Sequence, residues 1–492
     1  MSLPPASRIL VGACALSAAA AVAHPAHAQG SRGHLTPGTF AITDVAVVPM
    51  TSASVLQRAV VVVRHGRIEA VGPARTVKVP AGARRIDGQG KYLIPGLADM
   101  HTHLYSDDPG IPDSVGPDEL GVMLANGITV ARFMIGTPEH LRLRRELETV
   151  RLVGPQLWVA SPQFAGKPYD NGVVVTTPEN ARAAVARARD DGYDFIKLTM
   201  HITRPVYDAI VDEAGRRGIR VIGHVDPQVG VPRALEAGQQ IEHLDGYFES
   251  ILADSVAGRI SVSNYGVFQP KNWETIDLVD DAKLARLAEA TARAGVWSTP
   301  TLTIFNTAFA MGETDEAMAR RPDWRMIPPS VRELYLGART KYWRTAATEA
   351  RRRRYVEIRN ELTRRIAAAG GKIMAGSDTP EWLMAYGWTL HRELEALVAA
   401  GLTPYQALEA ATRNPAEFLG ASREWGTIER GKRADLVLLS GNPLEDIRNT
   451  TRIEGVAVGG RWLAPPELQR LIATASERLN GAPPASGPAG GQ

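Results

Sequence analysis

Cysteine is almost missing from this chain of 492 residues, in which Cys14 is the only one. A single thiol cannot form an intramolecular disulfide, so the fold must be stabilised by a hydrophobic core or by bound metal. An excess of one charge is missing too, because 56 Lys and Arg stand against 53 Asp and Glu, a formal net charge of +3. This balance argues against a nucleic-acid partner bound through an extended basic surface.

Long apolar runs are also missing after the N-terminal segment, so the mature chain is expected to have no membrane span. The N-terminal segment itself contains Arg8, the apolar stretch Ile9–Ala23 and the small-residue site Ala26-His27-Ala28. This pattern is typical of a secretory signal peptide, and its apolar stretch is too short to cross a bilayer. We therefore expect residues 1–28 to be removed near Ala28, Cys14 with them, and the mature protein to be periplasmic or secreted.

Both ends of the remaining chain contain short apolar runs separated by turn residues, a pattern that predicts strands. These runs are Ala41–Val48, Ala59–Val63, Arg67–Val71, Lys91–Ile94, Ala434–Leu439 and Ile453–Trp462. Because they flank a large middle region, we expect one small β-sandwich built from residues 39–96 and 426–465. Residues 481–492, rich in Pro, Gly and Ala, are expected to form a disordered tail.

The middle region, residues 97–425, alternates apolar strands with amphipathic helices and therefore predicts parallel βα units. The strand candidates are Leu97–Leu104, Ile128–Met134, Gln156–Ala160, Phe195–Thr199, Arg220–Val225, Gln240–Leu244, Val296–Leu302 and Lys372–Ser377. Eight such units predict an α/β fold with a closed (β/α)₈ TIM-like barrel. The connection 304–361 is too long for an ordinary loop and is interpreted as a helical insertion over the barrel mouth.

Histidine is scarce, with eleven in the chain, yet four of them lie at the ends of predicted strands. They are His101 and His103 on the first strand, His224 on the fifth and His243 on the sixth. Strand ends of this kind converge at the barrel mouth. Residues two apart on a strand face the same side, so His101 and His103 can bind one cation together. Imidazole suits Zn²⁺ and similar metals.

Two further residues fit the same pattern. Asp378 ends the eighth predicted strand, and Lys197 lies within the apolar fourth strand. A lysine that points into a barrel loses its hydration, which favours the neutral amine. Such an amine, close to two cations, could react with CO₂ to give a carbamate whose oxygens bridge the metals. Each residue alone is ordinary, but six of them in order at the strand ends predict a metal centre.

At these residues the sequence resembles the amidohydrolase superfamily, in the group of imidazolonepropionase-like proteins and Xaa-Pro and Xaa-Arg dipeptidases. The matching stretches are Lys91–Leu97 before the two histidines, Asn126–Thr129, Phe195–Lys197, Gly223-His224, Glu242-His243, Ala375–Asp378 and Gly431–Leu436. The resemblance implies that His101 and His103 bind the more buried of two metal ions, and His224 and His243 the more exposed one. It also implies that Lys197, as a carbamate, bridges both ions and that Asp378 binds metal and transfers protons.

The resemblance implies a binuclear hydrolase, with Zn²⁺ as the expected metal, that cleaves an amide or peptide C–N bond. The expected substrate is a small molecule such as a dipeptide or an N-acyl amino acid. Two cations would activate a water between them, and Asp378 would move its proton to the leaving nitrogen. The sequence leaves three other functions open: a lactonase or esterase with the same site, a mononuclear deaminase, and a catalytically silent barrel acting as a binding module. A homo-oligomer is also compatible with the sequence.

Two segments depart from the family's pattern. Relatives often read Arg-Asp-Met-Gly-Gly where this chain has Arg132–Gly136, and a glycine-rich turn where it has Thr199–Thr203. Both segments are expected to border the pocket, so the resemblance does not give the substrate. The candidate substrate contacts are Tyr247, Arg132, Tyr169, His201 and His391.

Overall fold

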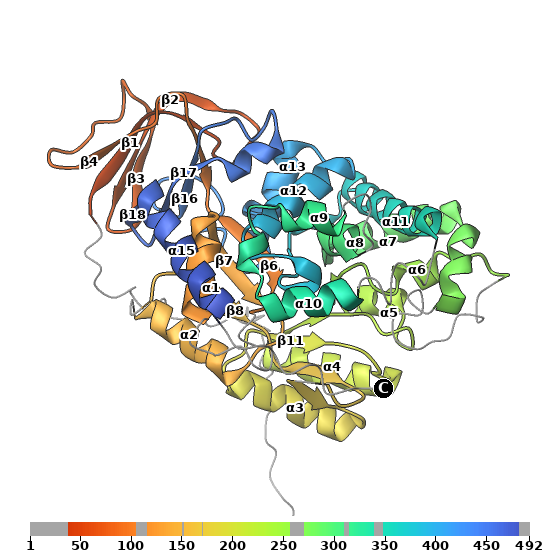
Figure 1. Cartoon of the computed structure of the whole chain (residues 1–492). Helices are drawn as coiled ribbons and strands as arrows, with labels where there is room; N and C mark the ends of the chain where they lie inside the picture. The colour runs from red at the N-terminus through yellow and green to blue at the C-terminus, as the bar shows by residue number, and fades with distance from the viewer. Residues whose placement is uncertain are drawn as a thin grey trace, which may run out of the picture.

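The computed structural model of this chain describes residues 38–104, 116–149, 152–169, 171–255, 270–308, 314–338 and 348–481. The predicted signal peptide, residues 1–28, lies outside the described residues, as do residues 482–492 of the expected tail. No helix within the described ranges is both long and apolar enough to cross a bilayer. A β-sheet module and a larger α/β body lie side by side in Figure 1.

Strands from both ends of the chain form one eight-stranded sheet. The N-terminal strands are β1 (Phe40–Val47), β2 (Leu56–Arg64), β3 (Arg67–Pro73), β4 (Arg84–Asp87) and β5 (Tyr92–Pro95). The C-terminal strands are β16 (Leu436–Leu439), β17 (Ile453–Val458) and β18 (Arg461–Leu463). The two sets join where β5 pairs with β16, in the order β18-β17-β16-β5-β1-β2-β3 with β4 on β1.

The sheet has its own hydrophobic core, which includes Val61, Val63, Leu438 and Trp462. Side chains alternate along a strand, so successive residues of β2 face opposite sides of the sheet. Val61 and Val63 therefore pack in this core, whereas Val60 packs in a second cluster. The prediction of a sandwich built from both ends of the chain is therefore confirmed.

Eight parallel strands form the barrel, and each lies within one of the eight predicted ranges. They are β6 (Leu97–Thr102), β7 (Ile128–Phe133), β8 (Gln156–Val159), β11 (Phe195–Leu198), β12 (Arg220–Gly223), β13 (Gln240–Glu242), β14 (Trp297–Thr299) and β15 (Lys372–Ile373). They form two hydrogen-bonded groups, of which the second also contains the short strands β9 (Gln163–Ala165) and β10 (Gly172–Val174). The bridges Ala160–Phe195 and Thr102–Thr379 connect the groups into a ring. The predicted barrel is confirmed.

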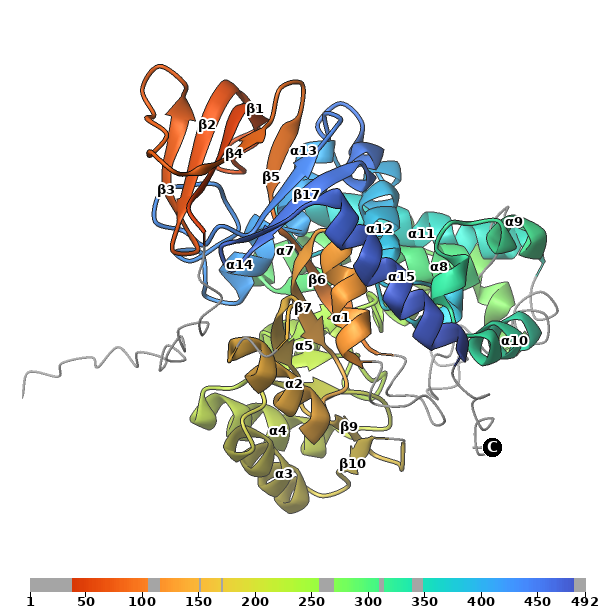
Figure 2. The same ribbon diagram turned by 60° about the vertical axis from the view of Figure 1, so that its left-hand side comes forward.

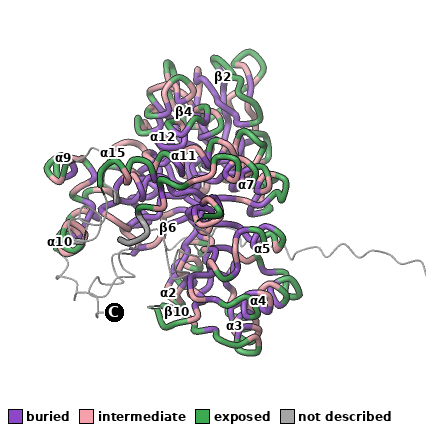
Figure 3. Tube along the Cα trace, turned by 90° about the vertical axis from the view of Figure 1, so that its right-hand side faces the viewer, coloured by how far each residue is buried: buried purple, intermediate pink, exposed green. Residues whose placement is uncertain are grey.

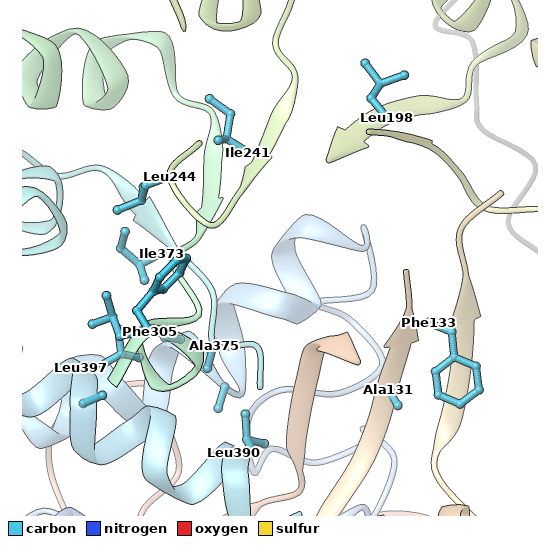
Figure 4. Close-up of a cluster of buried hydrophobic side chains, with 14 of the residues drawn as sticks. Ala131, Phe133, Leu198, Ile241, Leu244, Phe305, Ile373, Ala375, Leu390 and Leu397 are labelled. Atoms are coloured by element: carbon cyan, nitrogen blue, oxygen red, sulfur yellow. The ribbon is translucent and has the colours of Figure 1, made fainter. Parts of the chain in front are cut away.

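Helices surround the barrel (Figures 1 and 2). They are α1 (Gly116–Ala125), α2 (Pro138–Glu148), α3 (Pro178–Asp190), α4 (Arg204–Arg217), α5 (Val231–Glu236), α6 (Tyr247–Ser250), α7 (Asp281–Ala294), α12 (Trp388–Ala399), α13 (Pro404–Ala410) and α14 (Arg413–Phe418). Local signals set their ends: Thr177 caps α3 in a capping box, and the left-handed Gly218 ends α4. Figure 4 shows apolar side chains of the strands, such as Ile373, gathered with Leu390 and Leu397 of α12.

The predicted insertion 304–361 is helical where the structure describes it. Its elements are α8 (Leu302–Ala308), α9 (Asp315–Ala319), η5 (Trp324–Met326), α10 (Pro329–Ala338) and most of α11 (Glu349–Ala368). Helix α11 packs against α7 and therefore belongs to the barrel wall. Helix α10 packs instead against η7 (Glu381–Leu383), where the Tyr335 hydroxyl donates to Glu381 at 3.0 Å. Because η7 follows Asp378 closely, α10 is placed beside one loop of the mouth.

The last helix, α15 (Pro465–Gly481), lies along α1, as both ribbon views show (Figures 1 and 2). Arg478 forms an ion pair with Asp118 of α1 at 2.9 Å. The sequence did not predict this helix, which ties the C-terminal end to the barrel. Figure 3 shows that buried residues concentrate in the strands of the sheet and of the barrel.

Candidate metal centre

His101 of β6, His103 directly after β6 and one aspartate after β15 come together at the barrel mouth. The Nε2 atoms of His101 and His103 lie 3.1 and 3.3 Å from Oδ1 of Asp378. One potential ligand atom from each residue lies within 4.8 Å of the others, a spacing that can hold a metal ion. His101 and His103 share a face because they are two positions apart along the extended chain, with Thr102 between them. The strand pattern had predicted this pairing.

The backbone at this point is shaped to bring β15 against β6. A Cβ atom on Gly376 would lie 2.7 Å from Cβ of His101, so only glycine permits this approach. Oδ1 of Asp99 accepts hydrogen bonds from the backbone N–H groups of His101 and Ser377, at 3.2 and 2.9 Å. Asp378 itself has φ 56°, in the left-handed region that non-glycine residues rarely adopt. Such backbone strain is typical of functional sites.

The other two predicted histidines continue the group. The ring centroids of His101 and His243 are 4.6 Å apart, and those of His243 and His224 are 4.9 Å apart. His243 follows β13 with a left-handed φ of 57°, and His224 follows β12. The four imidazoles therefore form one continuous cluster. The ligand atoms that lie within 4.8 Å of one another belong to His101, His103 and Asp378.

Three of these rings are oriented through their Nδ1 atoms. His101 Nδ1 lies 2.7 Å from Glu242, His224 Nδ1 lies 2.5 Å from Asp245, and His243 Nδ1 lies 2.7 Å from the Thr301 hydroxyl. A hydrogen bond at one ring nitrogen fixes the tautomer and leaves the other nitrogen free to bind a metal. These three partners were not predicted from the sequence. An acidic residue inside a buried strand, as Glu242 is, was the available signal.

The charges of the cluster are strongly coupled. Although burial alone would favour the neutral acid, His101 and His243 hold the pKa of Asp378 well below its ordinary value. The carboxylates of Asp378 and Glu242 raise the pKa of His101, although burial alone would lower that pKa. Burial lowers the pKa of His243 well below its ordinary value. Asp378 is thus ionised and His243 neutral near pH 7, the protonation states that metal binding requires.

Lys197 lies on β11 and is 1% exposed. Burial lowers the pKa of its amine to about 8, although the carboxylates of Glu242 and Asp378 favour the charged form and raise that pKa. A pKa near 8 gives an appreciable fraction of neutral amine close to neutral pH. Its positive charge lowers the pKa of each of the four histidines, so the amine lies near their cluster.

Three of the predicted substrate contacts are buried and hydrogen-bonded within the protein. Arg132, Tyr247 and His391 are each at most 1% exposed. The Tyr247 hydroxyl lies 2.8 Å from that of Thr291, and His391 Nδ1 lies 2.9 Å from the Thr450 hydroxyl. Their polar atoms have partners inside the protein, and their contact with substrate stays a prediction.

The remaining two candidates, Tyr169 and His201, lie together and more exposed. Tyr169 is 37% exposed, and its ring stacks on His201 at a centroid distance of 6.4 Å. The backbone N–H of His201 donates to Asp226, two residues after His224, at 2.6 Å. These two residues therefore flank the loop that carries His224, and their contact with substrate stays a prediction.

A small cavity opens beside the loops that follow β12 and β13. Its lining residues include Met200, Val225, Leu244 and Phe248, with polar groups from Asp245, Glu249, Tyr355 and Arg359. Asp245 also binds His224, so the cavity lies next to the histidine cluster. The sequence analysis did not find these polar groups, because Tyr355 and Arg359 belong to α11, far along the chain.

An eight-stranded barrel whose strand ends gather histidines, an aspartate and a buried lysine is the framework of a metal-dependent hydrolase. Residues 92–463 match the Amidohydrolase family, and the chain belongs to that family. The family resemblance inferred from the sequence is thereby confirmed. The protein is accordingly a hydrolase that acts on C–N bonds.

Known proteins resemble the chain over most of its length. It is 26% identical to the imidazolonepropionase of Symbiobacterium thermophilum over 411 residues, 80% of this chain and 86% of that one. Its fold resembles that of a Bifidobacterium longum protein proposed to be a prolidase, with 25% identity, a TM-score of 0.64 and coverage of 89% and 99%. A Xaa-Pro dipeptidase with bound methionine shares the fold at 20% identity, with a TM-score of 0.63 and coverage of 87% and 100%.

Proposed function

We propose that this protein is an exported, binuclear amidohydrolase that cleaves the amide or peptide bond of a small substrate. Dipeptides and N-acyl amino acids are the proposed substrate class. The observation that carries the proposal is the group of His101, His103 and Asp378, with the other predicted ligands beside it. The similarity to an imidazolonepropionase and to a protein proposed to be a prolidase supports a C–N bond as the target.

The residues present fit two divalent cations, for which Zn²⁺ is the first choice. His101, His103 and Asp378 would hold one ion, and His224 and His243 would hold the second. Lys197, carboxylated by CO₂, would supply the anionic group between them, and its lowered pKa supports this role. When bound, such cations polarise a carbonyl and activate water for attack.

Asp378 is the proposed proton carrier. It would take a proton from the attacking water and deliver it to the leaving nitrogen, as a general base and then a general acid. Its two oxygens face different histidines, with Oδ1 toward His101 and His103 and Oδ2 3.7 Å from Nδ1 of His243. The side chain is therefore held at the centre of the cluster, where the scissile bond must be attacked.

The cavity beside His224 is the proposed place for the part of the substrate next to the scissile bond. Apolar walls at Leu244 and Phe248 would take a side chain, and the polar groups would orient the ends of the molecule. Tyr169 and His201 would contact the substrate at the rim.

The test uses the mature protein, residues 29–492, loaded with Zn²⁺. Dipeptides, N-acyl amino acids and lactones are offered in parallel, and the metal content is measured. We expect two metal equivalents, hydrolysis of at least one amide class, and loss of hydrolysis in Asp378→Asn. Turnover of lactones alone would replace the proposal by a lactonase or esterase. One metal equivalent would favour the mononuclear deaminase, and no metal a silent barrel.

Export is proposed from the N-terminal pattern alone. The expected mature N-terminus is Gln29, after Ala26-His27-Ala28. N-terminal sequencing of the protein recovered from its native host tests this, and a chain that begins at Met1 would contradict it.

A further inference from the structure

Arg132 of β7 lies in the barrel interior with no exposed surface. Its Nη2 donates to Oε1 of Glu242 at 2.6 Å, its Nη1 to Oε1 of Gln240 at 3.0 Å, and its Nε to the Met100 carbonyl at 2.6 Å. These acceptors belong to β6 and β13, on either side of the barrel interior. Because the guanidinium is planar and rigid, three directed bonds leave it one orientation.

Glu242 connects this arginine to the metal centre. Its second oxygen, Oε2, lies 2.7 Å from Nδ1 of His101. Glu242 and Gln240 share the inward face of β13, because alternate residues of a strand point the same way. Nε2 of Gln240 donates to the Thr299 hydroxyl at 3.0 Å, which turns its carbonyl oxygen toward Arg132. The chain Arg132–Glu242–His101 is therefore fixed at each link.

His101 and His224 differ in what holds their carboxylate partners. His224 also has a carboxylate partner, Asp245, but no arginine or lysine lies within ion-pair distance of Asp245 in the ranges that the structure describes. Of these two carboxylates, only the one at His101 is itself held by a buried cation. A fully buried ion pair contributes little net stability and is often replaceable by apolar residues. Stability alone therefore does not explain an arginine here.

We propose that Arg132 is a positioning residue of the metal centre, which holds Glu242 so that His101 keeps its Nε2 atom directed at the cation. Arg132 would act through two other side chains and would touch neither metal nor substrate. This inference rests on the proposed metal centre. It also gives a role to a residue first predicted as a substrate contact.

Three variants separate positioning from stability. Arg132→Met leaves Glu242 buried without its cation, and Glu242→Gln leaves Arg132 without its anion, so both single variants should be less stable. The double variant removes both charges and should recover the thermal stability of the metal-free wild type. Zn²⁺ affinity is then measured by competition with a chelator. We expect the double variant to bind Zn²⁺ about 10–100-fold more weakly than wild type, because the partner that orients His101 is changed.

A conservative variant and a control pair complete the experiment. Arg132→Lys keeps the charge but cannot bind its three acceptors together, and should also lower Zn²⁺ affinity by about tenfold. The pair Arg144–Asp194, 2.8 Å apart and away from the cluster, provides the control. Its double variant, Arg144→Met with Asp194→Asn, should bind Zn²⁺ as wild type does.

The outcomes are distinct. Unchanged Zn²⁺ affinity in the stable Arg132→Met, Glu242→Gln double variant or in Arg132→Lys would overturn the positioning role alone. An equal loss of affinity in the Arg144–Asp194 control would also overturn it, because the effect would then be a general one of buried charge. A wild-type protein that binds no Zn²⁺ would overturn the metal centre and, with it, this inference.

Discussion

At the scale of single residues, Gly376 is a position where one added methyl group should disturb the candidate metal centre. In Gly376→Ala the new methyl would lie 2.7 Å from Cβ of His101 and 2.6 Å from Cγ2 of Thr299. The clash should push β15 away from β6, lower stability by about 1–3 kcal/mol and reduce bound Zn²⁺. Metal analysis and chemical denaturation measure both effects.

The matched control is Gly215→Ala, at a helical position of α4 with nothing within 4 Å of the new methyl. Because alanine favours helix over glycine, this variant should be as stable as wild type or more so by up to about 1 kcal/mol. Equal Zn²⁺ content in Gly376→Ala and Gly215→Ala would contradict the argument.

Lys197 and Asp378 should respond differently to substitution. Lys197→Ala removes the anionic bridge, so metal and activity should be lost together, and added short carboxylic acids should partly restore both. Asp378→Asn keeps its shape but not its basicity, so turnover should fall by roughly 10²–10⁴-fold while most metal stays bound. Metal content and turnover are measured for both variants. Full metal occupancy in Lys197→Ala would show that Lys197 does not bridge the two ions. Near-normal turnover in Asp378→Asn would show that another group transfers the proton.

At the scale of secondary-structure elements, α12 and α8 are joined by a buried carboxylate. Glu393 of α12 accepts hydrogen bonds from the backbone N–H groups of Leu302 and Thr303, at 2.9 and 2.8 Å. Burial raises the pKa of this carboxyl from 4.5 to about 7. The folded protein therefore keeps a proton here that the unfolded chain has already released. The free energy of unfolding should fall as the pH rises from about 4.5 to 7 and then level off.

Glu393→Gln tests this pH dependence. Between pH 5 and pH 8 the wild-type protein should lose roughly 2 kcal/mol more stability than the variant, because only wild type has the titrating group. Urea denaturation of the metal-free proteins at the two pH values gives the difference. The same pH dependence in both proteins would show that Glu393 is ionised throughout.

Helix α10 is expected to influence which substrates are cleaved. The Tyr335 ring packs 5.3 Å from Trp382 in η7, and its hydroxyl binds Glu381. Tyr335→Ala should change relative KM values across a substrate panel while the metal content stays that of wild type. Leu334→Ala, at the neighbouring residue that is 44% exposed, should change neither. Loss of metal in Tyr335→Ala would mean that α10 supports the barrel rather than the substrate.

The barrel strands were predictable because their apolar runs are distinct, yet several predicted ends were too long. The chain leaves the sheet just before two candidate ligands, because β12 ends at Gly223, with φ 121°, and β13 ends at Glu242. His243 and Asp378 themselves have positive φ. Since non-glycine residues normally avoid this region, residue type does not reveal such turns. The short strands β9 and β10 and helix α15 were missed as well.

The candidate metal ligands were predictable from their places at strand ends, whereas their hydrogen-bond partners were not. Glu242 and Thr301 meet His101 and His243 only through the barrel's closure, which sequence spacing does not encode. The burial of three of the five candidate substrate contacts was not predictable for a related reason. A tyrosine such as Tyr247 has the same chemistry in a pocket or against Thr291, and only packing decides between them.

At the scale of the whole molecule, bound metal should act as a cross-link. The proposed ligands come from β11 and from the ends of β6, β12, β13 and β15, so each ion would tie together strands distant in sequence. Metal that binds only the folded state stabilises it, by about 2.7 kcal/mol at a free concentration of 100 times Kd. Chelator-treated protein should therefore unfold at a lower temperature than the Zn²⁺-loaded protein in calorimetry. Identical melting temperatures would contradict strong binding at these residues.

The pairing of β5 with both β1 and β16 has a consequence for biosynthesis. The ribosome makes β1–β5 first and β16–β18 last, so one edge of β5 stays open until most of the chain exists. Pairing between such distant segments is slow, and an open strand edge invites association with other chains. A nascent chain that stops before Leu436 cannot complete the sheet. Premature termination should therefore yield aggregating fragments and no smaller active enzyme.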